Sequence, residues 1–399
     1  MNEFFTYLFL GIIIIFWLIL IFSKKITAFT FLILSLIIYY ERFSTINIDF
    51  VIKVLMLITV IICLFIYGFD KRFIKLWSII LLFFIIILFN SKFSTYYTFY
   101  DMISSFLSLM IGLLCYSVNW PGSYQLKPLK FLSLMPIISI ILGLIFLPTG
   151  LVPLFSRYDG SGLGGISLAT NLSFFCVVGI MSSTALFKET KEKKYRILSY
   201  VNFFIVLMTL TRGGIIACTI LLAPDFYNWL KESSKNQSKF IFSIISFIPI
   251  ATIIGWITPK IMERTFSDGA LNTSGRLDAW NYIISLIQNR WIGNGLGNLK
   301  TLVNDPVLKQ GFTAAHNEYV RIYFETGIIG FTIHLVIFCF IFSIARKKVY
   351  LELKTLVVTS MLCFMIYSFT DNTITNFRFW VPYLFVLSLI SRKFENYTS

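Results

Sequence analysis

Three side chains in this sequence combine charge or basicity with a position beside an apolar stretch. His316 lies in AAHNEYVRIYFETGIIG (314–330), where a polar segment meets an apolar one, and the 399-residue chain has only two histidines. Arg212 is a single charge within VLMTLTRGGIIACTILL, and Arg276 follows a glycine in TSGRLDAW. Arginine offers a planar fork of donors suited to phosphate, and a neutral imidazole can accept a proton. These residue types are suited to neutralising an anion and deprotonating a hydroxyl.

Each of the three also has a plainer explanation. Arg212 can be a guanidinium that extends to the membrane interface, Arg276 a solvated loop arginine, and His316 an interfacial residue that caps a helix. Gly213 and Gly214 favour a functional Arg212, because small residues allow a ligand or helix to approach closely. Arg276 is predicted at a helix N-terminus, whose dipole and amide donors attract anions. The dipole at the start of the following helix disfavours a charged His316, and a general base must be neutral.

Further candidates come from neighbouring segments. Arg157, in the glycine-rich connection SRYDGSGLGG, is a weaker anion-binding candidate of the same kind. Arg321 and Glu325 are spaced for an i,i+4 ion pair on the helix that His316 is expected to open. The second histidine, His334, lies deep in an apolar stretch and is interpreted as a packed or hydrogen-bonded helix residue.

The composition indicates which elements must position these residues. Hydrophobic residues make up 57% of the chain and charged residues 13%. Only helices and closed barrels satisfy the backbone in a bilayer, and the apolar runs are continuous rather than alternating. We therefore predict an all-α, polytopic transmembrane helical bundle of about 12–14 spans with one large ordered extracytoplasmic loop. The predicted spans lie near 4–22, 26–41, 50–69, 74–90, 98–118, 131–148, 164–187, 195–211, 212–229, 239–257, 318–345, 353–370 and 377–391.

The net charge of +15 is mostly a signal of membrane orientation. Seven alternate connections hold 21 of the 34 basic residues, and the positive-inside rule places them in the cytoplasm. No contiguous basic face on a soluble domain indicates a nucleic-acid partner. Arginine is concentrated among the basic residues on the other side, which favours an anionic ligand there, with chance and helix capping as the alternative. These outer arginines are Arg42, Arg157, Arg212, Arg264, Arg276, Arg290, Arg321 and Arg378.

The apolar pattern divides the chain into three parts. Residues 1–257 are predicted to form a bundle of about ten spans, 258–317 a large extracytoplasmic loop, and 318–399 the C-terminal transmembrane helices. Within the loop, residues 275–290 read as an amphipathic helix, capped by Thr273 or Ser274. The glycine-rich WIGNGLGN after it is expected to stop the helix and let the backbone pass close to another segment. One face of this helix is expected to hold Leu277, Trp280, Ile284 and Ile287.

The motifs that this sequence lacks narrow the chemistry. There is no Walker loop, no HExxH and no DxD pair for a metal-held nucleotide sugar. The six cysteines fall in apolar stretches and form no ligand spacing. We therefore expect neither a metal nor a cofactor, and arginines rather than a metal to neutralise a leaving group.

The combination of LTRGG, SGRLDAWNYIISLIQNRWIGNGLGN and AAHNEYVRIYFETGIIG resembles the O-antigen ligase and O-antigen or capsule polymerase superfamily. The resemblance is specific over about 205–335. It implies a glycosyltransferase that takes glycans from undecaprenyl diphosphate and joins them to an acceptor hydroxyl, without a metal and with inversion. The implied place is the bacterial cytoplasmic (inner) membrane, with the site facing the periplasm or outside.

The resemblance also implies residue roles and partners. Arg212 and Arg276 would hold the donor diphosphate, and His316 would be the base, with Asn317 and Glu318 in support. The implied partners are the undecaprenyl-diphosphate-linked glycan, an acceptor glycan or lipid A-core, the lipid bilayer, and chain-length regulator and flippase proteins. Many ligases have a second histidine where this chain has Ala314, which favours polymerase over ligase.

Two alternatives to a polymerase remain at the level of sequence, besides a purely structural role in a larger assembly. An O-antigen ligase would transfer the glycan to lipid A-core. A flippase or transporter for the same lipid-linked glycan belongs to another class, but transporters place ionisable residues at mid-span and show repeat symmetry. The notable charges here lie at the outer face and in one loop, which favours catalysis.

Overall fold

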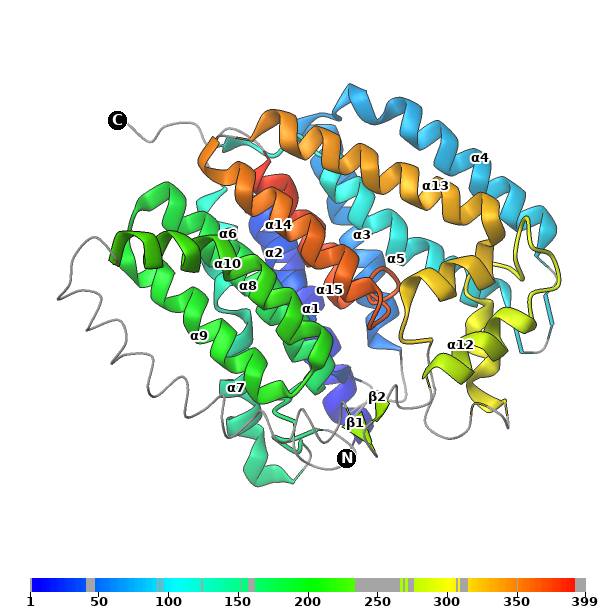
Figure 1. Ribbon diagram of the computed structural model, residues 1–399, viewed down its shortest axis with the longest axis horizontal. Helices are drawn as coiled ribbons and strands as arrows, with labels where there is room; N and C mark the ends of the chain where they lie inside the picture. The colour runs from blue at the N-terminus through cyan, green and yellow to red at the C-terminus, as the bar shows by residue number, and fades with distance from the viewer. Residues whose placement is uncertain are drawn as a thin grey trace.

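In the residues that the computed structural model of this chain describes, the named elements are helices and one two-stranded hairpin (Figure 1). The residues it describes are 2–40, 47–91, 93–94, 96–122, 125–150, 152–156, 162–233, 266–267, 270–271, 276–305, 308, 315–349 and 351–391. The first helices are α1 (Asn2–Ser23), α2 (Lys25–Ser35), α3 (Ile48–Tyr67), α4 (Ile74–Asn90), α5 (Phe99–Ser117), α6 (Leu126–Ser133), α7 (Met135–Phe146) and α8 (Ala169–Thr190). They are followed by α9 (Lys193–Thr209), α10 (Arg212–Ser233), β1 (Phe266–Ser267), β2 (Ala270–Leu271), α12 (Arg276–Ser285), α13 (Glu318–Lys348), α14 (Leu351–Ser368) and α15 (Phe377–Ile390). Short 3₁₀ turns are η2 (Lys71–Phe73), η4 (Leu147–Thr149) and η5 (Asn298–Asn304).

The predicted all-helical, multi-pass membrane fold is confirmed. Among the described residues, five helices are long and apolar enough to cross a membrane, and a bent pair makes a sixth if it counts as one span. The five are α3, α5, α8, α13 and α14, and shorter apolar helices lie in α1, α2, α4 and α15. Length and composition therefore identify fewer complete spans in the described part than the 12–14 predicted from hydropathy.

The differences from the predicted spans have local causes. The expected span 131–148 is broken into α6 and α7, which meet at an angle of 45°. Pro136 at the start of α7 has no amide hydrogen to continue the ladder, which suits a new helix start. The expected span 26–41 contains only the 11-residue α2. The expected span 239–257 lies outside the described residues.

Two helices form the centre of the bundle. Every residue of α15 is buried, and 89% of the best membrane-like window of α8 is buried as well. In α15, Trp380 donates from its ring nitrogen to the carbonyl of Leu109 on α5 at 3.1 Å, and Phe379 stacks on Phe174 of α8. A helix that is apolar on all sides is expected in such an interior position. The segment leading into α15 is therefore held between central helices.

The loop helix is shorter than predicted, and its buried face was predicted wrongly. Helix α12 runs from Arg276 to Ser285 instead of over 275–290. Its buried residues are Ala279 and Ile283, whereas Leu277 is 51% exposed and Ile284 41% exposed. The expected caps Thr273 and Ser274 lie outside the described residues. With only ten residues, α12 offers few apolar positions, so its contacts with α13 decide which side is buried.

The glycine-rich segment after α12 lies directly against a break in α13. Gly327 has φ 62° and ψ −165°, which interrupts the helix. The amides of Ile328 and Ile329 donate to the carbonyls of Arg290 and Trp291 at 2.9 and 3.0 Å. A Cβ on Gly327 would lie 2.4 Å from the backbone of Trp291. The predicted close backbone approach of WIGNGLGN is confirmed, and its neighbour is the start of the long helix α13.

Candidate functional site

The connection between α14 and α15, residues 369–376, is the centre of the candidate site. The amides of Thr370 and Asp371 both donate to the carbonyl of Tyr367, at 2.9 and 3.0 Å, which ends α14 in a tight turn. Asn376 caps α15 with its side-chain oxygen and donates to Asn171 of α8 at 3.2 Å. These bonds fix the connection, here called the 369–376 loop, at both ends.

Arg276 extends from the first residue of α12 to this loop. Its Nη1 donates to the carbonyl oxygen of Thr370 at 3.0 Å. Burial lowers the pKa of Arg276, the carboxylate of Asp371 raises it, and the like charge of Arg212 lowers it again. The last effect means that the guanidinium groups of Arg212 and Arg276 lie within electrostatic range of each other, although 64 positions separate them in the sequence.

Arg212 reaches the same place because its neighbour has no side chain. Arg212 is the first residue of α10, and Gly213 packs against the 369–376 loop. A Cβ on Gly213 would lie 1.9 Å from the hydroxyl oxygen of Thr370. A Cβ on Gly214 would lie 2.0 Å from the hydroxyl of Ser173 on α8. The two glycines therefore allow the N-terminus of α10 to approach both elements closely, as expected from the LTRGG sequence.

His316 faces a carboxylate of the same loop. Its Nδ1 lies 3.5 Å from Oδ1 of Asp371, with the two side chains 29% and 14% exposed. His316 has φ 47°, in the left-handed region, and precedes the N-cap residue Asn317. The expectation that His316 opens the helix is therefore wrong: α13 begins at Glu318, because Asn317 accepts the amide hydrogens of Tyr319 and Val320. An imidazole with a carboxylate at one nitrogen can take up a proton at the other.

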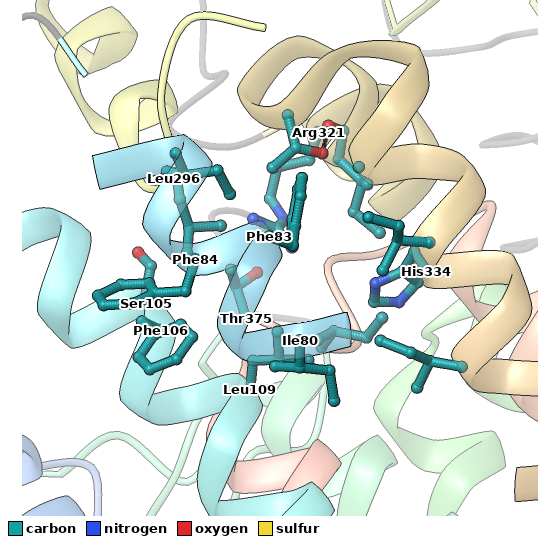
Figure 2. Close-up of a pocket in the computed structure, with 17 residues that line it drawn as sticks. Ile80, Phe83, Phe84, Ser105, Phe106, Leu109, Leu296, Arg321, His334 and Thr375 are labelled. Carbon is teal, nitrogen blue, oxygen red and sulfur yellow. Dashed lines mark hydrogen bonds between the residues drawn. The ribbon is translucent and has the colours of Figure 1, made fainter. Parts of the chain in front are cut away.

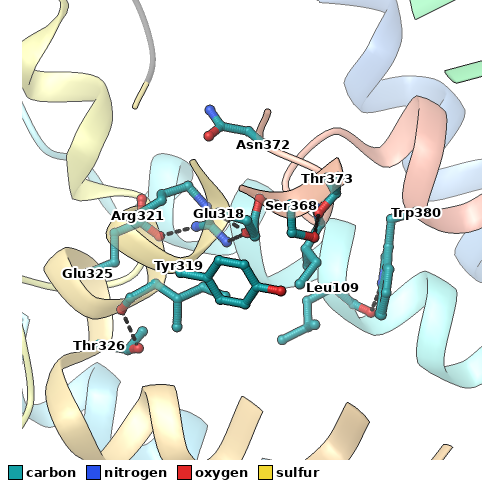
Figure 3. Close-up of polar contacts among 12 residues, drawn as sticks. Leu109, Glu318, Tyr319, Arg321, Glu325, Thr326, Ser368, Asn372, Thr373 and Trp380 are labelled. Carbon is teal, nitrogen blue, oxygen red and sulfur yellow. Dashed lines mark hydrogen bonds and ion pairs between the residues drawn. The ribbon is translucent and has the colours of Figure 1, made fainter. Parts of the chain in front are cut away.

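The predicted supporting residues have structural contacts of their own (Figure 3). Asn317 is buried and caps α13. Glu318 and Arg321 form a buried ion pair, and the predicted i,i+4 pair between Arg321 and Glu325 is confirmed. Arg321 is thus paired with two carboxylates of its own helix. The remaining supporting candidate, Arg157, lies outside the described residues.

A pocket lies between α4, α5 and α13, and the ion-paired Arg321 is one of the residues that line it (Figure 2). Most of its lining is aliphatic or aromatic, including Phe83 and Phe84 of α4 and Leu109 of α5. Arg321 and His334 of α13 point toward it in Figure 2. His334, interpreted from the sequence as a packed or hydrogen-bonded helix residue, therefore also lines a pocket. Arg212, Arg276 and His316 are not among the residues that line the pocket.

The structure therefore brings Arg212, Arg276 and His316 together around two residues that the sequence analysis missed, Thr370 and Asp371. Asp371 stands in the polar segment FTDNTITN, and its only visible signal was an acidic residue between two apolar helices. Among the described residues, no three His, Cys, Asp or Glu side chains are grouped so as to hold a metal ion. The described site contains two guanidinium groups and an imidazole that faces a carboxylate. Groups of these kinds can bind an anion and transfer a proton.

Comparison with known proteins finds a family to which part of this multi-pass helical membrane protein is similar. The family model described as O-Antigen ligase matches residues 197–335. An O-antigen polymerase from Salmonella muenchen is 27% identical over 190 residues, which cover 46% of this chain and 47% of that protein. The chain thus aligns with about half the length of this curated relative. The resemblance to the O-antigen ligase and polymerase family is confirmed over this region.

The matched region contains three of the four residues that meet at the 369–376 loop. Arg212, Arg276 and His316 all lie within residues 197–335, whereas Asp371 lies beyond its end. The contact of Asp371 with His316 is consequently a finding of the three-dimensional structure alone.

Proposed function

We propose that this protein is a glycan polymerase of the bacterial cytoplasmic membrane. It transfers undecaprenyl-diphosphate-linked repeat units to an acceptor sugar hydroxyl on the outer face, by a metal-independent, inverting reaction. The observation that supports the proposal is that Arg212, Arg276 and the His316–Asp371 pair lie together at the 369–376 loop. Arg212, Arg276 and His316 also lie in the region that the family model matches. Its acceptor is the end of another lipid-linked glycan.

In this mechanism the two arginines act on the leaving group. The acceptor oxygen forms a bond to the anomeric carbon of the donor while the bond from that carbon to the diphosphate oxygen breaks. The electron pair leaves with undecaprenyl diphosphate, and Arg212 and Arg276 offset the charge that develops there. Because Arg276 is anchored at the Thr370 carbonyl through Nη1, its guanidinium is already oriented before the donor binds.

The proton of the acceptor hydroxyl goes to His316. Nδ1 of His316 faces Asp371, so Nε2 is the atom that accepts the proton, and the carboxylate stabilises the imidazolium that forms. A positioned base of this kind contributes about 10²–10⁴-fold in rate. A single displacement at the anomeric carbon inverts its configuration, in agreement with the family resemblance.

A ligase that transfers the glycan to lipid A-core is the second candidate. The description of the matching family model, O-Antigen ligase, favours it, whereas the Salmonella muenchen relative is named a polymerase. Ala314, which favoured the polymerase in the sequence, lies outside the described residues. The arginine and histidine chemistry is the same in both, and the acceptor alone differs.

Deletion of the protein, followed by separation of the cell-surface glycans, distinguishes these functions. Single repeat units on the final acceptor indicate a lost polymerase, which is the expected result. Long chains stranded on undecaprenyl diphosphate indicate a lost ligase. Unpolymerised units that accumulate on the cytoplasmic side indicate a flippase and contradict the proposal.

Complementation of the deletion strain tests the site itself. Wild-type protein should restore long glycan, and His316→Ala should not, while both proteins are present in the membrane at equal level. Normal chain lengths with His316→Ala would show that His316 is not the base.

A further inference from the structure

A buried ion network on α13 is bonded to two of the segments that position the candidate site. Arg321 forms ion pairs with Glu318, one turn earlier, and Glu325, one turn later (Figure 3). Nε of Arg321 donates to Oε1 of Glu318 at 2.8 Å. The three side chains are at most 5% exposed. Taking ions out of water is costly, so a buried network of this kind is weak evidence for a contribution to stability alone.

Other oxygens of Glu318 and Glu325 accept backbone amide hydrogens of other segments. Oε2 of Glu318 accepts the amide hydrogen of Ile374, in the 369–376 loop, at 3.1 Å. The carbonyl oxygen of Glu325 accepts the amide hydrogen of Gly295, in the segment that follows α12, at 2.9 Å. The two residues paired with Arg321 therefore bond α13 to the 369–376 loop and to the glycine-rich segment.

These two segments hold the partners of the site residues. The 369–376 loop presents the Asp371 carboxylate to His316 and the Thr370 carbonyl to Arg276. The glycine-rich segment continues from α12, which begins at Arg276, and it is further bound to α13 by the Asn294 amide and the Phe324 carbonyl at 3.0 Å. A shift of either segment along α13 would separate the groups that the proposed reaction needs together.

We propose that Glu318, Arg321 and Glu325 are positioning residues: their network holds the 369–376 loop and the glycine-rich segment so that Asp371 faces His316 and the Thr370 carbonyl holds Arg276. This inference rests on the proposed function. Glu318 acts through the Ile374 amide and thereby through Asp371, and Glu325 acts through the segment that continues from Arg276.

A double-mutant cycle between Glu318→Gln and Asp371→Asn tests this route of action. The variants are purified in lipid nanodiscs, and transfer is measured with undecaprenyl-diphosphate-linked repeat units as donor. Glu318→Gln should lower kcat about 10-fold with the donor KM changed less than about 2-fold. In the Asp371→Asn background it should lower kcat by less than about 2-fold, because residues that act through one contact are not additive.

If Glu318 had only a structural role, the kcat values of the double-mutant cycle would show a different pattern. A smaller folded fraction lowers the rate by the same factor with or without Asp371, so multiplied effects in the cycle would overturn the inference. If Glu318→Gln fails to accumulate, Glu325→Gln and Arg321→Lys take its place, with the changed kcat and unchanged KM as the readout. Full kcat in all three folded variants would likewise overturn it.

Asp49→Asn is the matched control. Both carboxylate oxygens of Asp49 on α3 accept from Nη2 of Arg378 on α15, whose side chain is 4% exposed, so the loss of Asp49 also disturbs the ion pair of a buried arginine. It should leave kcat per folded molecule unchanged. Failure of the proposed function can be distinguished from failure of the positioning inference. If His316→Ala transfers glycan normally, the base assignment is wrong whatever the double-mutant cycle shows. If His316→Ala is inactive and the Glu318 cycle is multiplicative, only the positioning inference is wrong.

Discussion

Arginines occur in two different settings in this molecule. Arg321 is paired with Glu318 and Glu325 on its own helix, and Arg378 donates to both oxygens of Asp49 at 2.7 Å. Both arginine side chains are at most 5% exposed. In each case an ion pair supplies the charge that burial would otherwise leave uncompensated. Arginines in this first setting hold helices and loops together.

The second setting is at the 369–376 loop. Arg276 donates to a neutral backbone carbonyl, that of Thr370, and the positive charge of Arg212 lies within electrostatic range. Asp371 is the nearby carboxylate, and it also faces His316. Two guanidinium groups within electrostatic range of each other would attract an anionic ligand such as a diphosphate. The difference between the settings shows that a predicted position on the outer side of the membrane does not by itself identify an arginine as a ligand-binding residue.

The largest expected effect is on the stability of the first setting. Arg321→Met leaves two buried carboxylates without their cation and should destabilise the protein by about 3–5 kcal/mol. Unfolding in detergent, followed by circular dichroism, measures the loss. Arg290→Met, at an exposed arginine, is the control and should change stability by less than about 0.5 kcal/mol. Equal stability of the two variants would show that the ion pairs of Arg321 do not contribute to stability.

The second setting should show the opposite pattern, with a large effect on rate. Arg276→Ala removes a guanidinium from the leaving group and should lower kcat/KM about 10²–10³-fold. The lost bond to the Thr370 carbonyl should cost only about 0.5–1.5 kcal/mol of stability. Initial rates with the lipid-linked donor and unfolding midpoints of the same preparations test both values. A well-folded Arg276→Ala protein with near-normal rates would exclude the diphosphate role.

A smaller effect is expected where α10 meets the loop. In Gly213→Ala the new methyl group would clash with the Thr370 side chain, so the loop must shift and the Thr370 carbonyl moves relative to Arg276. The rate should fall about 10-fold, the consequence of a small misplacement of a catalytic group. Gly11→Ala on α1 has open space around its Cβ and should leave the rate unchanged. Identical rates in both variants would argue against precise placement of the α10 N-terminus.

The smallest effect is expected at Lys300, an exposed cation of η5, in the segment that follows α12. Lys300 pairs with Asp101 at 3.1 Å and is 54% exposed. Because water and salt screen such a pair, Lys300→Met should change stability by less than about 1 kcal/mol and leave transfer intact. The unfolding and transfer assays used for Arg321 and Arg276 apply. A large loss of transfer would place Lys300 in the site and extend the second setting.

The sequence predicted the features that depend on local spacing or on composition. The apolar runs indicated a multi-pass helical protein, and the i,i+4 spacing predicted the Arg321–Glu325 pair. LTRGG and WIGNGLGN indicated close backbone approach, which the structure shows at Gly213 and Gly327.

What the sequence could not predict depends on tertiary packing. His316 and Asp371 are 55 positions apart, and nothing local indicates that α14 turns back to bring them together. The bond between Glu318 and the Ile374 amide is hidden for the same reason. The buried side of α12 was also predicted wrongly, because ten residues leave the choice of face to the surface on which the helix packs.

The most direct test of the proposed site measures release of undecaprenyl diphosphate from a lipid-linked repeat unit by the purified protein in nanodiscs. Wild-type protein should release it together with an elongated glycan. His316→Ala should still bind the donor but release it at least about 100-fold more slowly, since the base is lost while both arginines remain. Release at the wild-type rate by His316→Ala, or donor binding by the wild type with no bond cleavage, would contradict a glycosyl transfer site at the 369–376 loop.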